Sequence, residues 1–140
     1  MPLMNRLYRT SQIFHGLGLG WLGRIVQLVI RVLFQASIPG TATIAPNVFF
    51  HHSGLGVVIN KYSVIERDCE IGVHVVLGGK SPLPGAPHLE PDVIVHAGAK
   101  VIGPILIGRG SVIAANAVVL SDVPPYTLVA ECPPSLSGQA

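Results

Sequence analysis

The stretch D-V-I-V-H-A-G-A-K-V-I-G-P-I-L-I-G-R-G-S-V-I-A-A-N-A-V-V, residues 92–119, carries an aliphatic residue at every sixth position. A six-residue period matches neither the 3.6-residue period of a helix nor the two-residue period of an ordinary strand. It is typical of hexapeptide repeats, in which the chain winds around a triangular prism as a parallel β-helix. The in-phase residues are Val95, Val101, Ile107, Ile113 and Val119, and a second, mostly small set follows four positions after each of them, at Ala99, Ile105, Ser111, Ala117 and Val123.

The period continues toward the amino terminus, although its phase shifts by three residues within residues 51–58. We therefore predict an all-β fold, a parallel β-helix from Ile38 to about Val123 with four to five coils of three short strands each. Large aliphatic residues should fill the axis, and small residues should fit the tight corners. The in-phase residues are Ile38, Ile44 and Phe50 before the shift and Ile59, Ile65, Ile71, Leu77 and Leu89 after it, with Ala42, Val48, Ser63, Cys69 and Val75 in the second set.

Three segments depart from the six-residue period and divide the chain. Residues 1–37 form a leader, residues 38–123 form the β-helix, and residues 124–140 form a tail rich in proline, serine and glycine. Pro124 and Pro125 should end strand pairing, because proline lacks the N–H that a strand donates. Residues 78–88 contain three prolines and three glycines, which predicts a loop that leaves the prism.

The leader is expected to form two short helices, residues 4–15 and 21–35, separated by glycines. In the second helix Arg24, Gln27 and Arg31 share one face, and the opposite face is strongly apolar. This run is shorter than the roughly 20 residues that span a bilayer, and its internal arginines make a poor secretory signal. Two interpretations stay open: the apolar face packs on the end of the prism or on a neighbouring subunit, or it contacts a membrane surface.

Composition limits the classes of function. The formal net charge of +2 is too small to indicate nucleic-acid binding. Charged residues make up 11% of the chain, so we expect an apolar or neutral surface that meets other copies of the chain. The two cysteines, Cys69 and Cys132, form no disulfide or metal-binding pattern, which fits a reducing compartment such as the cytoplasm.

Four segments carry distinctive motifs: F-H-H-S-G-L-G-V-V-I (50–59), V-V-L-G-G-K (75–80), H-A-G-A-K-V-I-G-P-I-L-I-G (96–108) and A-A-N-A-V-V-L-S-D-V-P-P (114–125). Together they resemble the bacterial serine acetyltransferases, and in particular the short serine acetyltransferase-like enzymes found with exopolysaccharide genes. The resemblance implies a left-handed β-helix that forms a homotrimer, with an active site between adjacent prisms. It also implies transfer of an acetyl group from acetyl-CoA to the hydroxyl of L-serine, a step in cysteine biosynthesis in the cytoplasm.

The resemblance assigns the role of general base to His52, whose imidazole can accept a proton from the acceptor hydroxyl. On sequence chemistry alone, a solvated surface histidine fits His52 equally well. The phase shift places His52 in a bulge or turn at an edge of the prism. His51 occupies the position of a substrate-binding aspartate in the longer enzymes, and His88 lies two residues from the position of their second active-site histidine. The resemblance therefore makes His51 and His88 candidate substrate-binding residues.

The cofactor residues are also implied by the resemblance. Gly78, Gly79 and Lys80 would contact acetyl-CoA from the Gly-rich loop, with Lys80 meeting a phosphate. Ala97 and Ala115 would let the thin pantetheine chain lie against the backbone. Small residues are equally what the corners of a prism require, so the two alanines also fit a purely structural role.

Several expected polar groups are missing from this sequence. The aspartate that orients the catalytic histidine in the longer enzymes would fall at Ser37, the second histidine at Ala86, and the arginine before it at Gly85. These groups would hold the charged ends of serine, so a sugar hydroxyl of an exopolysaccharide is the alternative acceptor. No serine or cysteine is paired with a base, and we therefore expect direct attack on acetyl-CoA without a covalent acyl-enzyme.

Two rival functions remain. A zinc-dependent hydratase of the γ-carbonic anhydrase type also uses a β-helix trimer, and His52, His74 and His96 recur at equal spacing along the chain. In such an enzyme a second metal ligand would be expected five positions from His96 on the same coil. Those positions hold Val101 and Pro91, so no metal site is predicted. The other rival is a non-catalytic β-helix that serves as a scaffold.

Overall fold

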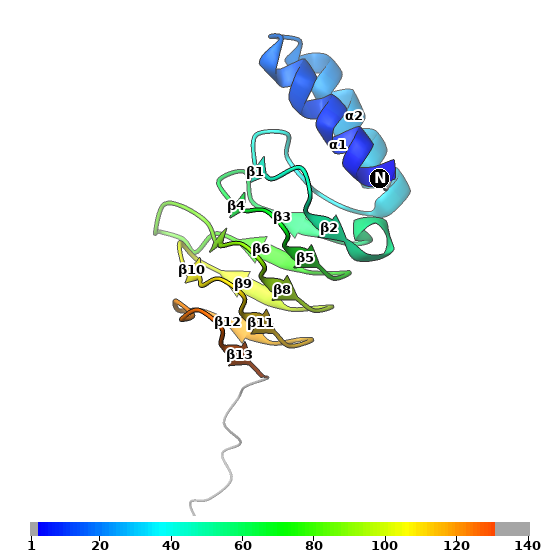
Figure 1. Cartoon of the computed structure of the whole chain (residues 1–140). Helices are drawn as coiled ribbons and strands as arrows, with labels where there is room; N and C mark the ends of the chain where they lie inside the picture. The colour runs from blue at the N-terminus through cyan, green and yellow to red at the C-terminus, as the bar shows by residue number, and fades with distance from the viewer. Residues whose placement is uncertain (1–2, 131–140) are drawn as a thin grey trace, which may run out of the picture.

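The structure, a computed structural model, describes residues 3–130 as a helical pair standing on one end of a three-sided β-helix (Figure 1). Helices α1 (Leu3–Gly16) and α2 (Gly20–Phe34) come first, and the strands then wind away from them, coil after coil. The predicted parallel β-helix with a helical leader is therefore confirmed, and so are the two helices expected within the leader.

Each face of the β-helix is a parallel sheet, and the chain visits the three faces in turn. The first face contains β1 (Thr43–Ile44), β4 (Val64–Ile65), β7 (His88–Leu89) and β10 (Leu106–Ile107). The second contains β2 (Phe49–Phe50), β5 (Glu70–Ile71), β8 (Ile94–Val95), β11 (Val112–Ile113) and β13 (Leu128–Val129). The third contains β3 (Val58–Ile59), β6 (Val76–Gly78), β9 (Lys100–Ile102) and β12 (Val118–Val119).

The strand register explains how the six-residue period survives two interruptions. Val58 pairs with Val76, so an uninterrupted coil consists of three six-residue repeats. The pairing of Thr43 with Val64 closes a longer coil, because the corner between β2 and β3 holds three extra residues. The pairing of Val64 with His88 closes a coil that is longer still, because the loop between β6 and β7 adds six. An insertion of six preserves the phase and an insertion of three shifts it, as the sequence shows.

The predicted inward residues form the core. All of them are buried except Ile44 and Ile105, which are partly buried against the same core. Val57 and Val93 are also fully buried, and both precede an inward aliphatic residue by two positions, where the second set of small residues is expected. The aliphatic residues therefore fill the axis and the smaller ones fill the corners, as the period predicts.

The corners require a left-handed backbone at the residue just before the small inward residue. Asp68, His74, Asp92 and Asn116 occupy this position with φ between 55° and 63°. Asp, Asn and His tolerate positive φ better than other residues with a side chain. Gly98 occupies the equivalent corner of another coil with φ of 74°, and an added Cβ there would collide with the Asn116 side chain. These residue types are therefore explained by corner geometry.

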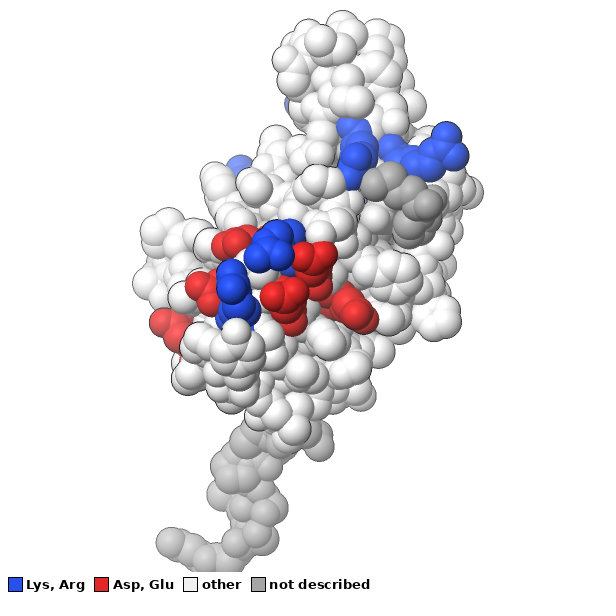
Figure 2. Space-filling model, viewed as in Figure 1, with Lys and Arg blue, Asp and Glu red and all other residues white. Residues whose placement is uncertain are grey.

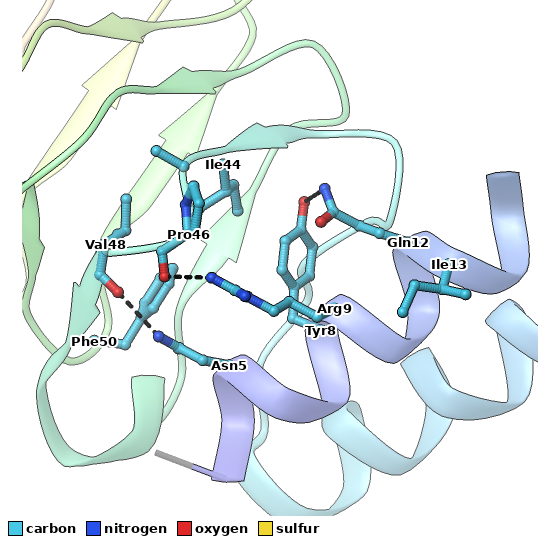
Figure 3. Close-up of a pocket in the computed structure, with 10 residues that line it drawn as sticks. Asn5, Tyr8, Arg9, Gln12, Ile13, Ile44, Pro46, Val48 and Phe50 are labelled. Carbon is cyan, nitrogen blue, oxygen red and sulfur yellow. Dashed lines mark hydrogen bonds between the residues drawn. The ribbon is translucent and has the colours of Figure 1, made fainter. Parts of the chain in front are cut away.

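Helix α1 is anchored on the first coil by its buried face (Figure 3). Asn5 Nδ2 donates to the Val48 carbonyl at 3.0 Å, and an Arg9 guanidinium nitrogen donates to the Pro46 carbonyl at 2.8 Å. The buried Tyr8 hydroxyl donates to another carbonyl of this coil at 2.6 Å, and burial raises its pKa. A cavity of about 330 Å³ remains between α1 and the coil. The leader is thus joined to the β-helix by polar contacts as well as by packing.

Helix α2 packs against α1 and buries Gly23 and Ile30. Its strongly apolar face points away from both α1 and the β-helix, and no segment within residues 3–130 covers it. Packing of this face on the end of the prism is therefore not what the structure shows, whereas packing on a neighbouring subunit and contact with a membrane surface stay open. Neither α1 nor α2, within the described residues, is long and apolar enough to cross a bilayer.

The prediction that Pro124 and Pro125 end strand pairing is wrong by one strand. β13 pairs in parallel with β11, so the second face continues beyond the prolines. The prolines lie in the corner before β13, where no ladder N–H is needed, and the Pro124 carbonyl accepts a hydrogen bond from the Ser111 hydroxyl at 2.8 Å. The rest of the expected tail, residues 131–140, lies outside the described residues.

Candidate functional site

His52 lies in η1 (His51–Gly54), the short helix formed at the corner that holds the three extra residues. His52 and Ser53 have φ of 47° and 59°, so the chain turns sharply and displays the His52 side chain at the surface. Gly56 is required shortly after this turn, because its φ is 67° and an added Cβ would collide with the His74 ring. The prediction that His52 sits in a bulge at an edge of the prism is confirmed.

We call the edge between the second and third faces the histidine edge; it consists of residues 51–57, 72–75, 96–99 and 114–117. Ala97 and Ala115 lie on this edge, one uninterrupted coil apart and hence at equivalent positions of successive coils. Both are exposed, and the Ala97 carbonyl accepts a hydrogen bond from the Asn116 N–H at 3.0 Å. The structure therefore brings His52 and the two alanines onto one edge.

The Gly-rich loop lies on the next edge, between the third and first faces, which we call the loop edge (residues 60–63 and 79–87). Gly78 ends β6, and Gly79 and Lys80 begin the loop. Gly79 and Lys80 line a hollow of about 410 Å³ together with Asn60 and Tyr62 of the coil before. The prediction of a projecting loop is confirmed, and its residues lie on a different edge of the prism from His52.

Two of the predicted substrate residues form pairs with carboxylates. His51 Nε2 lies 2.9 Å from an oxygen of Glu70 on the neighbouring strand β5. His88 Nε2 lies 2.7 Å from an oxygen of Glu66, which follows the neighbouring strand β4. All four side chains are about 40% exposed.

The sequence-based reasoning missed both glutamates. Counting the length of each coil and of its interruption pairs Glu70 with Phe49 and His88 with Val64. Each glutamate therefore lies diagonally across from its histidine, two positions away from direct pairing, and counting alone narrows the search to such neighbours without naming the contact.

Ser37 occupies the position at which an orienting aspartate was expected. Its backbone N–H donates to the Val57 carbonyl at 2.8 Å, and it forms a bridge with Val58, so it lies beside the strand that follows η1. An Arg31 guanidinium nitrogen of α2 donates to its hydroxyl at 3.1 Å. A basic residue of the leader therefore contacts the position at which the resemblance predicted an aspartate.

Cys69 is unsuited to covalent catalysis. Its side chain is fully buried in a corner of the prism, and its thiol donates to the Glu90 carbonyl at 3.1 Å. Burial raises the pKa of the Cys69 thiol to about 11, with a smaller contribution from nearby carboxylates. A thiol that keeps its proton is a poor nucleophile. Cys132 lies outside the described residues.

Histidines elsewhere on the histidine edge form no metal cluster in the described part of the chain. His74 and His96 lie on successive coils below His52, but they occupy different positions of the corner. Residues 3–130 contain no group of three or more histidine, cysteine, aspartate or glutamate side chains placed to hold a metal ion.

Comparison with known proteins bears on this arrangement. Residues 86–121 match the family described as bacterial transferase hexapeptide (six repeats). The chain is 35% identical over 134 residues to the serine acetyltransferase of Escherichia coli K12, an alignment that covers 94% of this chain and 49% of that protein.

Two solved structures superpose closely on this chain. The serine acetyltransferase of Neisseria gonorrhoeae in complex with serine does so with a TM-score of 0.86 at 27% identity, over 93% of this chain and 54% of that one. The serine acetyltransferase of Brucella abortus in complex with coenzyme A does so with a TM-score of 0.83 at 30% identity, over 91% and 52% of the two chains.

The six-residue repeat and the three parallel faces define a hexapeptide-repeat β-helix, and residues 86–121 match the bacterial transferase hexapeptide family. Within this class, the chain is serine acetyltransferase-like along most of its length, so the resemblance that the motifs indicated is confirmed. The chain spans about half the length of the curated relatives it matches.

Proposed function

We propose that this chain transfers an acetyl group from acetyl-CoA to a hydroxyl group, with L-serine as the first candidate acceptor. The observation that carries the proposal is the display of His52 at a sharp turn of the histidine edge, in a fold that superposes on serine acetyltransferases solved with coenzyme A and with serine. In this proposal residues 38–123 carry the transfer reaction and residues 1–37 are the leader.

His52 acts as the general base in the proposed reaction. It removes the proton of the acceptor hydroxyl while the oxygen attacks the thioester carbonyl of acetyl-CoA. Backbone N–H groups stabilise the resulting oxyanion. The tetrahedral intermediate then collapses, its carbon–sulfur bond breaks, and the protonated His52 returns its proton to the departing sulfur of coenzyme A. The buried, protonated state of Cys69 agrees with direct transfer.

The proposed cofactor residues lie on two edges of one prism, and this separation favours a shared site. His52, Ala97 and Ala115 lie on the histidine edge, whereas Gly79 and Lys80 lie on the loop edge. A site that uses both groups needs the histidine edge of one copy and the loop edge of another. We therefore include a cyclic homotrimer in the proposal, because rotation about one axis places unlike edges together.

The acceptor is the least constrained part of the proposal. Ser37 contacts Arg31, and Gly85 and Ala86 supply no charge, so the groups expected to hold serine are absent at these positions. Glu70, however, lies beside His51 and offers a half-exposed carboxylate to the ammonium group of serine. A neutral sugar hydroxyl of an exopolysaccharide remains the second candidate, because it needs no such charges.

Location in the cytoplasm and contact of the apolar face of α2 with a membrane surface complete the proposal. Acetyl-CoA is available in the cytoplasm, and a peripheral contact through α2 would leave the β-helix outside the bilayer.

The experiment offers L-serine and a panel of neutral sugars separately to the purified chain with acetyl-CoA, and detects O-acetylated product by mass spectrometry. We expect O-acetylserine. Acetylated sugar without O-acetylserine would move the chain to polysaccharide modification. If no product forms and calorimetry detects no acetyl-CoA binding, the transfer proposal is wrong and the scaffold remains.

A further inference from the structure

A basic hollow of about 270 Å³ lies where the leader meets the β-helix. Helix α2 contributes Arg24, Gln27, Leu28 and Arg31, and the first coil contributes Ser37 and the two residues after it. Arg24 and Arg31 are two helical turns apart on the same face of α2. The hydrogen bond from Arg31 to the Ser37 hydroxyl, 3.1 Å long, fixes one side of the hollow. We call this feature the arginine notch.

Among the described residues, the arginine notch has no counter-charge. Within residues 3–130 the ion pairs involve other residues, and none includes Arg24 or Arg31. The sequence contains no acidic residue before Glu66, and the acidic side chains visible in Figure 2 lie over the β-helix, away from the helical pair. Two guanidinium groups that face one hollow repel each other, and a bound phosphate relieves this repulsion through charge-assisted hydrogen bonds.

The notch borders an apolar stripe on the outward face of α2. Trp21, Ile25, Leu28 and Val32 are 62%, 50%, 59% and 70% exposed, and they follow one another at helical spacing. The buried Gly23 and Ile30 lie on the opposite side of the helix. Leu28 belongs to both the stripe and the notch, so the cationic and apolar surfaces are continuous.

Charge distinguishes between the occupants that could cover this surface. A second copy docked stripe to stripe would bring two wholly basic leaders together, with no acidic residue in either leader to compensate. A free phosphate ion would fill the notch and leave the stripe in water. An anionic bilayer supplies both phosphates for the notch and an apolar layer for the stripe, as interfacial amphipathic helices require.

We propose that the arginine notch binds the phosphate of an anionic phospholipid while the stripe of α2 lies at the boundary between headgroups and acyl chains. The leader then holds the β-helix against a membrane surface. This inference rests on the membrane contact that is part of the proposed function, and it adds which lipid and which residues make that contact. It does not depend on acetyl transfer. Its test therefore uses binding as the readout.

Trp21 is the single tryptophan of the chain and lies on the stripe, so its fluorescence reports insertion directly. The full chain is titrated with vesicles of phosphatidylcholine, with and without phosphatidylglycerol, and bound protein is separated by flotation. We expect flotation and a blue shift of Trp21 emission with phosphatidylglycerol. Binding should weaken as salt is raised.

The decisive variant is Arg24→Gln with Arg31→Gln, and the matched control is Arg67→Gln with Arg109→Gln. Both lower the net charge by two, but the control residues lie on the β-helix. At about 1 kcal/mol for each basic residue near an anionic surface, the notch variant should bind at least about tenfold more weakly. The control should bind within about twofold of the wild type, and circular dichroism checks that both variants are folded.

Three results would overturn the inference. The first is that the notch variant and the control variant bind vesicles equally. The second is that the wild type binds vesicles with and without phosphatidylglycerol equally, or binds neither kind. The third comes from soluble glycerol phosphate: if it saturates the notch in solution while vesicles leave Trp21 emission unchanged, the notch takes a free phosphate and not a lipid.

Discussion

Glu70 and His51 form the ion pair closest in sequence to the proposed base, and the pair bears on the choice of acceptor. The Glu70 carboxylate lies beside the position where a substrate-binding aspartate was expected, so it can meet the ammonium group of serine. A neutral residue at this position would remove that attraction.

We therefore predict that Glu70→Gln raises the KM for L-serine about tenfold or more and leaves the KM for acetyl-CoA nearly unchanged. The control is Glu90→Gln, since Glu90 accepts a backbone N–H through an oxygen that glutamine also supplies. Equal KM values for serine in wild type and Glu70→Gln would remove Glu70 from the acceptor site.

Cys69 allows a prediction about pH. Its pKa of about 11 exceeds the roughly 8.5 of an unfolded cysteine, so the folded protein keeps the thiol proton to higher pH. In a Cys132→Ser background, Cys69 should resist iodoacetamide at pH 8 and react fully in guanidinium chloride. The free energy of unfolding should also fall as pH rises from about 9 to 11, because the unfolded state then releases a proton that the folded state keeps. Rapid alkylation of the folded protein at pH 8 would contradict the buried thiol.

At the scale of the element, each strand contributes one side chain to the axis and one to the surface. On β10, Ile107 is fully buried and Leu106 is 41% exposed. Ile107→Ala should lower the free energy of unfolding by about 2–5 kcal/mol, because it leaves a cavity in a packed core. Leu106→Ala should lower it by less than about 1 kcal/mol. Urea denaturation measures both, and similar losses would contradict the assignment of the inward face.

The six-residue period made these inward positions predictable, because each coil repeats the same geometry and every in-phase residue must reach the axis. The loop between β6 and β7 did not obscure the pattern, since it adds six residues and preserves the phase. β13 was missed because the corner before it contains Pro124 and Pro125, and proline was read as the end of pairing when it occupies a turn.

The site was harder to predict than the fold. His52 was assigned from the resemblance, and the phase shift predicted only that it lies in a bulge at an edge of the prism. Glu66 and Glu70 contact their histidines across neighbouring coils, so predicting these contacts requires the register between coils. The six-residue period alone does not give that register, because it depends on the length of each interruption. A helical period likewise reveals that α2 has an apolar face without revealing which face meets the β-helix.

At the scale of the whole molecule, the separation of His52 and the Gly-rich loop onto two edges predicts a shared site. Light scattering should give three times the 14.7 kDa of one chain. His52→Ala and Gly79→Leu should each be inactive alone, the second because its side chain would fill the hollow lined by Asn60.

Mixing the two variants by co-expression should restore about a quarter of the sites, since some sites then combine an intact histidine edge with an intact loop edge. Recovery of no activity in mixed trimers of the correct mass would place the whole site within one chain.

The measurement that tests the central claim most directly is release of thiol from acetyl-CoA in the presence of L-serine, by wild type and by His52→Ala. Loss of a general base lowers the rate by about 10²–10⁴-fold. The control is His74→Asn, which removes a histidine from the next coil of the same edge and keeps a residue that tolerates the positive φ of 55°. We predict serine-dependent release by wild type and His74→Asn, and near-complete loss in His52→Ala with acetyl-CoA binding retained. Undiminished release by a folded His52→Ala would contradict the account.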